Sequence, residues 1–263
     1  MIRLGDAGAV APAGSGDPMR TGGNRMTTTP NVLLVHGAWA DGSAWSKVIE
    51  RLHDRGLGTV LASQLPLRGF AEDVATVTRD LDTLTGPTLL VGHSYGGAVI
   101  SQAGAGRSDV SGLVFVAAFT PNAGQSAFQL NQEFGQDLAS GADLVNIGSA
   151  ETPDLIIARD RYHADFAADA DPREAAVLAA TQKPTSVLSL AGSGTATPAW
   201  QTLRHNTWYQ ISELDQMIHP DLETKMAYQV ATEDHIVSLA TSHASMITQP
   251  DAIADLIVRA AAG

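Results

Sequence analysis

The pentapeptide Gly92-His93-Ser94-Tyr95-Gly96 constrains the fold of this chain more than any other segment. The apolar run 88–91 precedes it, and the helix-compatible run 98–103 follows it. A serine between two such elements must lie on a very sharp turn, usually with strained backbone dihedral angles. A side chain at Gly92 or Gly96 would then collide with the neighbouring strand or helix. The segment therefore predicts a strand, a tight turn that carries Ser94, and a helix.

Strand-like and helix-like segments alternate on both sides of this turn. The strand-like segments lie at 31–35, 59–62, 88–91, 113–118, 207–211 and 235–239, and those at 31–35, 88–91 and 113–118 are apolar runs. The helix-like segments are mostly amphipathic and lie at 44–55, 70–84, 98–103, 220–228 and 250–261. Strands without polar alternation are typical of a sheet that is buried on both faces, and alternation with helices favours parallel order. We therefore expect an α/β fold with a doubly wound, mostly parallel sheet flanked by helices.

Residues 121–205 interrupt the alternation and are rich in Ala, Asp, Gln and Gly. Short helical pieces are expected there at 154–159 and 172–181. We interpret this stretch as a helical cap inserted over the carboxyl ends of the strands, which leaves 29–120 and 206–263 as the α/β core. Residues 1–28 are expected to be a disordered N-terminal extension, with Met26 as an alternative start.

The composition narrows the range of partners. A net charge of −12 argues against nucleic acid or an anionic membrane surface as a partner. The chain has no cysteine, which excludes disulfides, cysteine-based zinc sites and a thiol nucleophile, and a cytoplasmic location is expected. No apolar run approaches transmembrane length. The sequence does not indicate an oligomeric state.

Ser94 needs two partners if it is to act as a nucleophile. A serine hydroxyl requires a base within hydrogen-bonding reach, and the base requires an orienting carboxylate. After a Gly-x-Ser-x-Gly turn these partners follow in the order acid, then histidine, on loops beyond late strands. Asp215 and His243 satisfy this order and are the predicted acid and base. Glu213, on the same loop as Asp215, and Asp234 are the alternative acids.

Two backbone N–H groups would have to stabilise the oxyanion of such a reaction. The residue after the serine, Tyr95, would donate one, and Ala38 in the loop after the first strand would donate the other. Gly37 would allow the backbone to approach closely. The candidate substrate-pocket residues, for each of which ordinary packing is the alternative, are Gly37, Trp39, Phe119, Phe128, Leu130 and Met246.

No metal or cofactor is expected. The polar cluster in the proposed cap consists of His163, Asp165, Asp169 and Asp171. It lacks both a glycine-centred calcium loop and a second histidine four residues away, so its pattern does not favour a metal site.

From about Asn31 onward the chain resembles the α/β-hydrolase superfamily. Within it, the chain is similar to the branch that holds plant methyl-ester esterases, hydroxynitrile lyases and their bacterial relatives. The segments that carry the resemblance are 32–39, 91–97, 113–119, 213–218 and 242–246. In that family the aspartate of the fourth segment and the histidine of the fifth complete a catalytic triad. The resemblance therefore favours Asp215 over Glu213.

Two positions distinguish the esterases of this branch from its lyases. The lyases have a threonine at the position of Gly37 and a lysine directly after the histidine, where this chain has Ala244. Without the charge of that lysine, a departing cyanide would be poorly stabilised. The resemblance therefore implies a cofactor-free hydrolase that cleaves a small carboxylic ester. The alternatives are lyase, C–C hydrolase, lactonase or cofactor-independent oxygenase chemistry, or a small-molecule receptor with little turnover.

Overall fold

The computed structural model describes residues 29–134 and 143–263. The predicted extension, residues 1–28, lies outside this part of the chain. The central sheet has six parallel strands in the order β2-β1-β3-β4-β8-β9. Their bounds are Asn31–Val35 (β1), Val60–Ser63 (β2), Thr88–His93 (β3), Val110–Val116 (β4), Thr207–Ser212 (β8) and Ile236–Leu239 (β9). The predicted doubly wound parallel sheet is confirmed.

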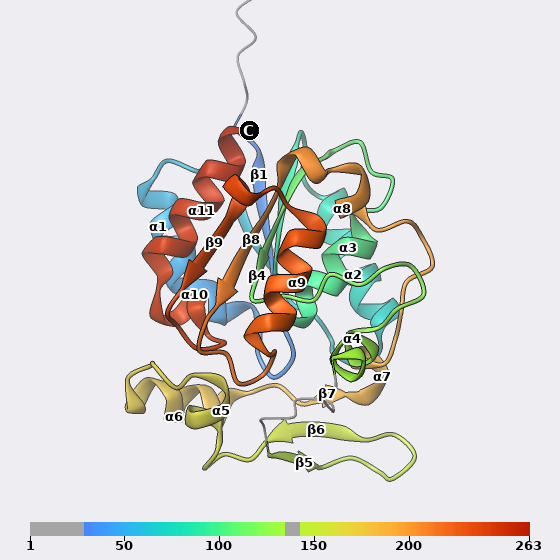
Figure 1. Ribbon diagram of the computed structural model, residues 1–263, viewed down its shortest axis with the longest axis vertical. Coiled ribbons are helices and arrows are strands. Elements are labelled where there is room, and N and C mark those ends of the chain that lie inside the picture. Colours follow the sequence, from blue (N-terminus) through green and yellow to red (C-terminus); the bar gives the residue numbers. More distant parts are fainter. Residues whose placement is uncertain (1–28, 135–142) are drawn as a thin grey trace, which may run out of the picture.

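Helices cover both faces of this sheet (Figure 1). Helices α1 and α11 pack together on one face, and α2, α3 and α9 lie on the other. Their bounds are Ser46–Asp54 (α1), Phe70–Asp82 (α2), Tyr95–Ala103 (α3), Pro220–Val230 (α9) and Pro250–Ala262 (α11). Because both faces are covered, the central strands β1, β3 and β4 bury nearly every side chain. This explains why their sequences are apolar without alternation.

Residues 143–190 of the segment expected to form a cap lie beyond the carboxyl ends of the parallel strands, whereas residues 199–202 lie beside α3 (Figure 1). The helices of the segment are Ala127–Glu133 (α4), Tyr162–Phe166 (α5), Pro172–Thr181 (α6), Val187–Leu190 (α7) and Ala199–Thr202 (α8). It also contains a small antiparallel sheet of strands Leu144–Asn146 (β5), Asp154–Ile157 (β6) and Thr185–Ser186 (β7).

The expectation of a helix at 154–159 is wrong, whereas the helix expected at 172–181 is confirmed as α6. Residues 154–157 form β6, the middle strand of the small sheet, which pairs with β5 on one side and β7 on the other. Four residues are too few to establish a helical period, and pairing with strands distant in sequence decides their conformation.

Candidate active site

Ser94 lies on the turn between β3 and α3 with φ 53° and ψ −124°, a strained conformation for a residue other than glycine. A Cβ atom on Gly92 would lie 2.7 Å from the carbonyl oxygen of Gly96. A Cβ atom on Gly96 would lie 2.5 Å from the carbonyl oxygen of Val35. Both glycines are therefore needed for α3 to pack against β1 and β3 directly after so sharp a turn.

Asp215 and His243 meet beyond the ends of β8 and β9. The Nδ1 atom of His243 is 2.5 Å from Oδ2 of Asp215, and both side chains are fully buried. The other carboxylate oxygen, Oδ1, accepts hydrogen bonds from the backbone N–H groups of Met217 (2.6 Å) and Ile218 (2.9 Å). These donors fix the carboxylate so that it orients the imidazole. Glu213, the alternative acid on the same loop, is exposed.

The imidazole of His243 lies against the residue that precedes Ser94. Its ring centroid is 4.6 Å from that of His93 and 5.0 Å from that of Phe166. The Nε2 atom of His93 donates a hydrogen bond to the backbone carbonyl of His243 (2.9 Å). Burial, and then the neighbouring His243, lower the pKa of His93 well below its ordinary value, so His93 is neutral. The turn that carries Ser94 thus also holds the loop that carries His243.

The Nε2 atom of His243 is buried and has no hydrogen-bond partner within 29–134 and 143–263. It forms no hydrogen bond with Ser94 Oγ in this structure. Such bonds are often long in a ligand-free site and shorten when substrate binds. No other described group therefore forms a hydrogen bond with the nitrogen that a general base would use.

Gly37 packs closely against Ser94, since a Cβ atom added to Gly37 would be 2.7 Å from Ser94 Cβ. The next residue, Ala38, has an N–H group without an acceptor among the described residues. The N–H of Trp39, by contrast, donates to Thr185 Oγ1 (3.0 Å). Tyr95 is the first residue of α3, so its N–H has no partner within the helix. Ala38 and Tyr95 line the same pocket as Ser94.

A small pocket opens at Ser94. Of the candidate pocket residues, Trp39 and Phe119 line it, whereas Phe128, Leu130, Met246 and Gly37 do not. The residues that line it are Ala38, Trp39, Ser94, Tyr95, Phe119, Ala127, Asn131, Leu190, Met217 and Ile218.

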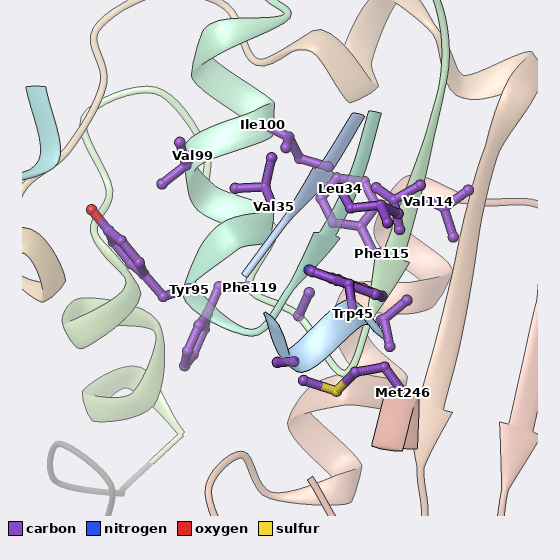
Figure 2. Close-up of a cluster of buried hydrophobic side chains, with 14 of the residues drawn as sticks. Leu34, Val35, Trp45, Tyr95, Val99, Ile100, Val114, Phe115, Phe119 and Met246 are labelled. Atoms are coloured by element: carbon purple, nitrogen blue, oxygen red, sulfur yellow. The ribbon is translucent and has the colours of Figure 1, made fainter. Parts of the chain in front are cut away.

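The positions outside the pocket have simple physical explanations. Helix α4 turns Ala127 and Asn131, one turn apart, toward the pocket. A helix rotates by about 100° per residue, so Phe128 and Leu130 point elsewhere. Met246 is buried in the core near Trp45 (Figure 2). In the same figure Phe119, a lining residue, lies near Tyr95.

A buried carboxylate supports the Tyr95 side chain. Asp73 in α2 accepts hydrogen bonds on Oδ2 from the hydroxyls of Tyr95 (2.7 Å) and Ser189 (2.9 Å). Its Oδ1 accepts from the N–H of Leu67 (2.8 Å). Burial raises the pKa of Asp73, and burial also raises the pKa of Tyr95 well above its ordinary value. This network joins α2, the turn at Ser94 and α7, and no pattern in the sequence indicated it.

A second buried acid lies behind Asp215. Glu223 in α9 is fully buried, and its Oε2 atom accepts a hydrogen bond from the N–H of Ser212 (2.9 Å). Burial, and then repulsion from the neighbouring Asp215, raise the pKa of Glu223 well above its ordinary value. This shift favours the neutral form of Glu223 beside Asp215.

Asp169 holds the loop that carries His243. Its Oδ1 accepts from the hydroxyl (2.5 Å) and the N–H (3.2 Å) of Ser242, and its Oδ2 accepts from the Thr241 hydroxyl (2.7 Å). Against the effect of burial, these hydrogen bonds lower the pKa of Asp169. Asp165, from the same polar cluster, pairs with Arg161 (2.8 Å). Both carboxylates thus have partners within the protein.

A parallel sheet with a serine on the turn after β3 and an Asp–His pair after β8 and β9 defines an α/β-hydrolase type of fold. A model of the alpha/beta hydrolase family matches residues 32–256, and the chain belongs to this family. No helix within the described residues is long and apolar enough to cross a bilayer.

Solved structures with a similar fold cover nearly the whole chain. The pyrethroid hydrolase PytH is 21% identical with a TM-score of 0.73, over 90% of this chain and 98% of that one. Polyneuridine aldehyde esterase is 17% identical with a TM-score of 0.75, over 88% and 99%. An extracellular alpha/beta-hydrolase from a Paenibacillus species is 20% identical with a TM-score of 0.69, over 88% and 98%. A search of curated protein sequences gives no match. At these identities the similarity establishes the fold.

Proposed function

We propose that the protein is a cofactor-free serine hydrolase that cleaves a small carboxylic ester through an acyl-enzyme. The observation that carries this proposal is the buried Asp215–His243 pair. The Nε2 atom of His243 has no hydrogen-bond partner among the described residues, and its imidazole packs against the turn of Ser94. The names of two structural neighbours, an esterase and a pyrethroid hydrolase, support ester chemistry on this fold.

The first half of the proposed reaction acylates Ser94. His243 Nε2 takes the proton of Ser94 Oγ as that oxygen attacks the ester carbonyl carbon. The N–H groups of Ala38 and Tyr95 stabilise the oxyanion, and Asp215 stabilises the imidazolium. The tetrahedral intermediate then collapses, and His243 gives its proton to the departing alkoxide. An acyl-Ser94 ester and a free alcohol result.

The second half hydrolyses the acyl-enzyme. His243 Nε2 removes a proton from a water molecule, whose oxygen attacks the acyl carbon. The same two N–H groups stabilise the second oxyanion. Collapse releases the carboxylic acid, and the proton returns from His243 to Ser94 Oγ. No step requires a metal or an organic cofactor.

The experiment that tests the proposal compares Ser94→Ala with the wild type on p-nitrophenyl acetate and butyrate. We expect kcat to fall by at least about 10⁴-fold. Ser101→Ala, in the same helix but outside the pocket, is the matched control and should retain activity. An unchanged rate in Ser94→Ala would refute the serine mechanism.

Product analysis with mandelonitrile tests the lyase alternative. Ala244 provides no positive charge next to His243 to stabilise a departing cyanide. We expect ester hydrolysis without release of cyanide. Release of cyanide at a rate comparable to ester turnover would favour the lyase function instead.

A further inference from the structure

The side chain of Asn131 is the one amide among the described residues that line the pocket at Ser94. Outside residues 38–39 and 94–95, the other lining residues are apolar, namely Phe119, Ala127, Leu190, Met217 and Ile218. Asn131 is 2% exposed, and its Oδ1 atom has no hydrogen-bond partner among the described residues. Buried polar atoms in native proteins nearly always have a hydrogen-bond partner, so the lack of one at Asn131 Oδ1 requires an explanation.

The position of Asn131 is fixed by the start of its helix. Ser126 and Gln129 form a capping box at the N-terminus of α4, in which each side chain accepts a hydrogen bond from the backbone N–H of the other residue. Ser126 also pairs with Ser193 as an isolated β-bridge. Asn131 follows Ala127 by one helical turn, and both face the pocket. The amide is therefore presented to the pocket by a helix whose start is locked.

We propose that Asn131 binds a hydroxyl group of the substrate, and that the preferred substrates are small esters that carry a hydroxyl group. This inference rests on the proposed ester hydrolysis. An amide oxygen accepts a hydrogen bond, and a hydroxyl can both donate and accept, so it can pair with either end of the amide. The apolar wall suits the carbon chain that connects this hydroxyl to the ester.

Two further properties of the pocket narrow the substrate class. None of the described lining residues carries a charge, so a substrate carboxylate or phosphate would have no counter-ion there. The free space at Ser94 is small, because Phe119, Leu190 and Met217 close around it. Uncharged, short-chain hydroxy esters meet both conditions.

The test uses pairs of esters that differ by one hydroxyl. Methyl butyrate is compared with methyl 2-hydroxybutyrate and methyl 3-hydroxybutyrate, and ethyl butyrate with 2-hydroxyethyl butyrate. The first set places the hydroxyl on the acyl side and the second places it on the alcohol side. For the wild type we expect kcat/KM to be about tenfold higher for at least one hydroxylated ester than for its unsubstituted partner.

Asn131→Leu removes the amide at similar volume, and we expect it to bring that ratio close to one. The matched control is Gln132→Leu, which makes the same kind of change on the exposed side of α4 and should keep the ratio. If Asn131→Leu does not fold, as judged by its melting temperature, Asn131→Ala takes its place in the same comparison.

Two results would overturn the inference. In the first, the wild type hydrolyses these esters with no preference for a hydroxylated one, or Asn131→Leu keeps the wild-type ratio. The proposed function then stands and the role of Asn131 does not. In the second, the wild type turns over no ester faster than Ser94→Ala does, and the proposed function fails together with the inference.

Discussion

Replacing Tyr95 by phenylalanine removes one hydroxyl from the buried network around Asp73. That hydroxyl donates to Oδ2 of Asp73 at 2.7 Å, and Asp73 retains the donors Ser189 and Leu67. A hydrogen bond to a charged group contributes about 1.5–3 kcal/mol. Since two donors remain, we expect the free energy of unfolding to fall by about 2 kcal/mol at pH 8. For a protein of this size, that loss lowers the melting temperature by about 4–8 °C.

The pH dependence of this loss tests its cause. Burial raises the pKa of Asp73 above its ordinary value of 3.8. The Tyr95 hydroxyl favours the ionised carboxylate, so its contribution is fully present above the folded-state pKa of Asp73. As the pH falls through that raised pKa, the contribution declines toward that of a neutral hydrogen bond, about 1 kcal/mol. The loss in free energy of unfolding that Tyr95→Phe causes should therefore become smaller as the pH falls.

Urea denaturation of the wild type and Tyr95→Phe at a series of pH values measures this penalty. Tyr228→Phe is the matched control, because Tyr228 in α9 is 55% exposed, and its free energy of unfolding should change by less than about 0.5 kcal/mol. A Tyr95→Phe penalty below about 0.5 kcal/mol at pH 8, or one that does not vary with pH, would refute the role assigned to Asp73.

Two further predictions concern other buried titratable groups. Glu223→Gln should keep kcat/KM within about threefold, because its amide oxygen can still accept from the N–H of Ser212 and the side chain adds no charge beside Asp215. Glu223→Ala leaves that N–H without its acceptor and should reduce kcat/KM by about tenfold or more. Steady-state kinetics measures kcat/KM for both variants. An equal reduction of kcat/KM in Glu223→Gln and Glu223→Ala would contradict a neutral Glu223. Burial lowers the pKa of His36 from 6.5 to about 4, and its Nε2 atom accepts from the N–H of Leu65 (3.0 Å). Its stabilising contribution is present above pH 6.5 and is lost as the pH falls toward 4, so between pH 7 and pH 4 the wild type should lose about 3 kcal/mol more than His36→Gln does. Parallel pH dependences of the two unfolding free energies would contradict this.

The parts of the fold that could be predicted from the sequence are those with a local physical cause. Gly92 and Gly96 are required by contacts with Gly96 and Val35 backbone atoms, so the turn at Ser94 could be recognised from five residues. Asp215 and His243 could be placed because the ends of parallel strands converge at one edge of the sheet. Residues far apart in the chain then meet wherever their strands end.

The lining of the pocket could not be predicted in the same way. Asn131 and Leu190 belong to the segment between β4 and β8, where no hydrophobic period indicates which side faces the core. Phe128 and Leu130 were expected in the pocket because they are large and apolar, but the rotation of α4 is set by its capping box and its tertiary contacts. The pairing of Asp73 with Tyr95 likewise depends on how α2 packs against α3.

The segment between β4 and β8 contributes polar contacts to three of the four loops that carry a candidate catalytic or oxyanion group. Thr185 accepts from the N–H of Trp39 after β1, Ser189 shares Asp73 with Tyr95 after β3, and Asp169 holds the residue before His243 after β9. Thr185, Ser189 and the residues at positions 39, 73 and 242 that they or Asp169 contact are buried. Moving the segment away would therefore leave several buried donors and acceptors without partners, at about 1–3 kcal/mol each. The segment that provides Asn131 to the pocket therefore also holds three of the loops that carry the candidate groups. It follows that substitutions at these contacts should change turnover as well as substrate preference, whereas a substitution at Asn131 acts mainly on preference.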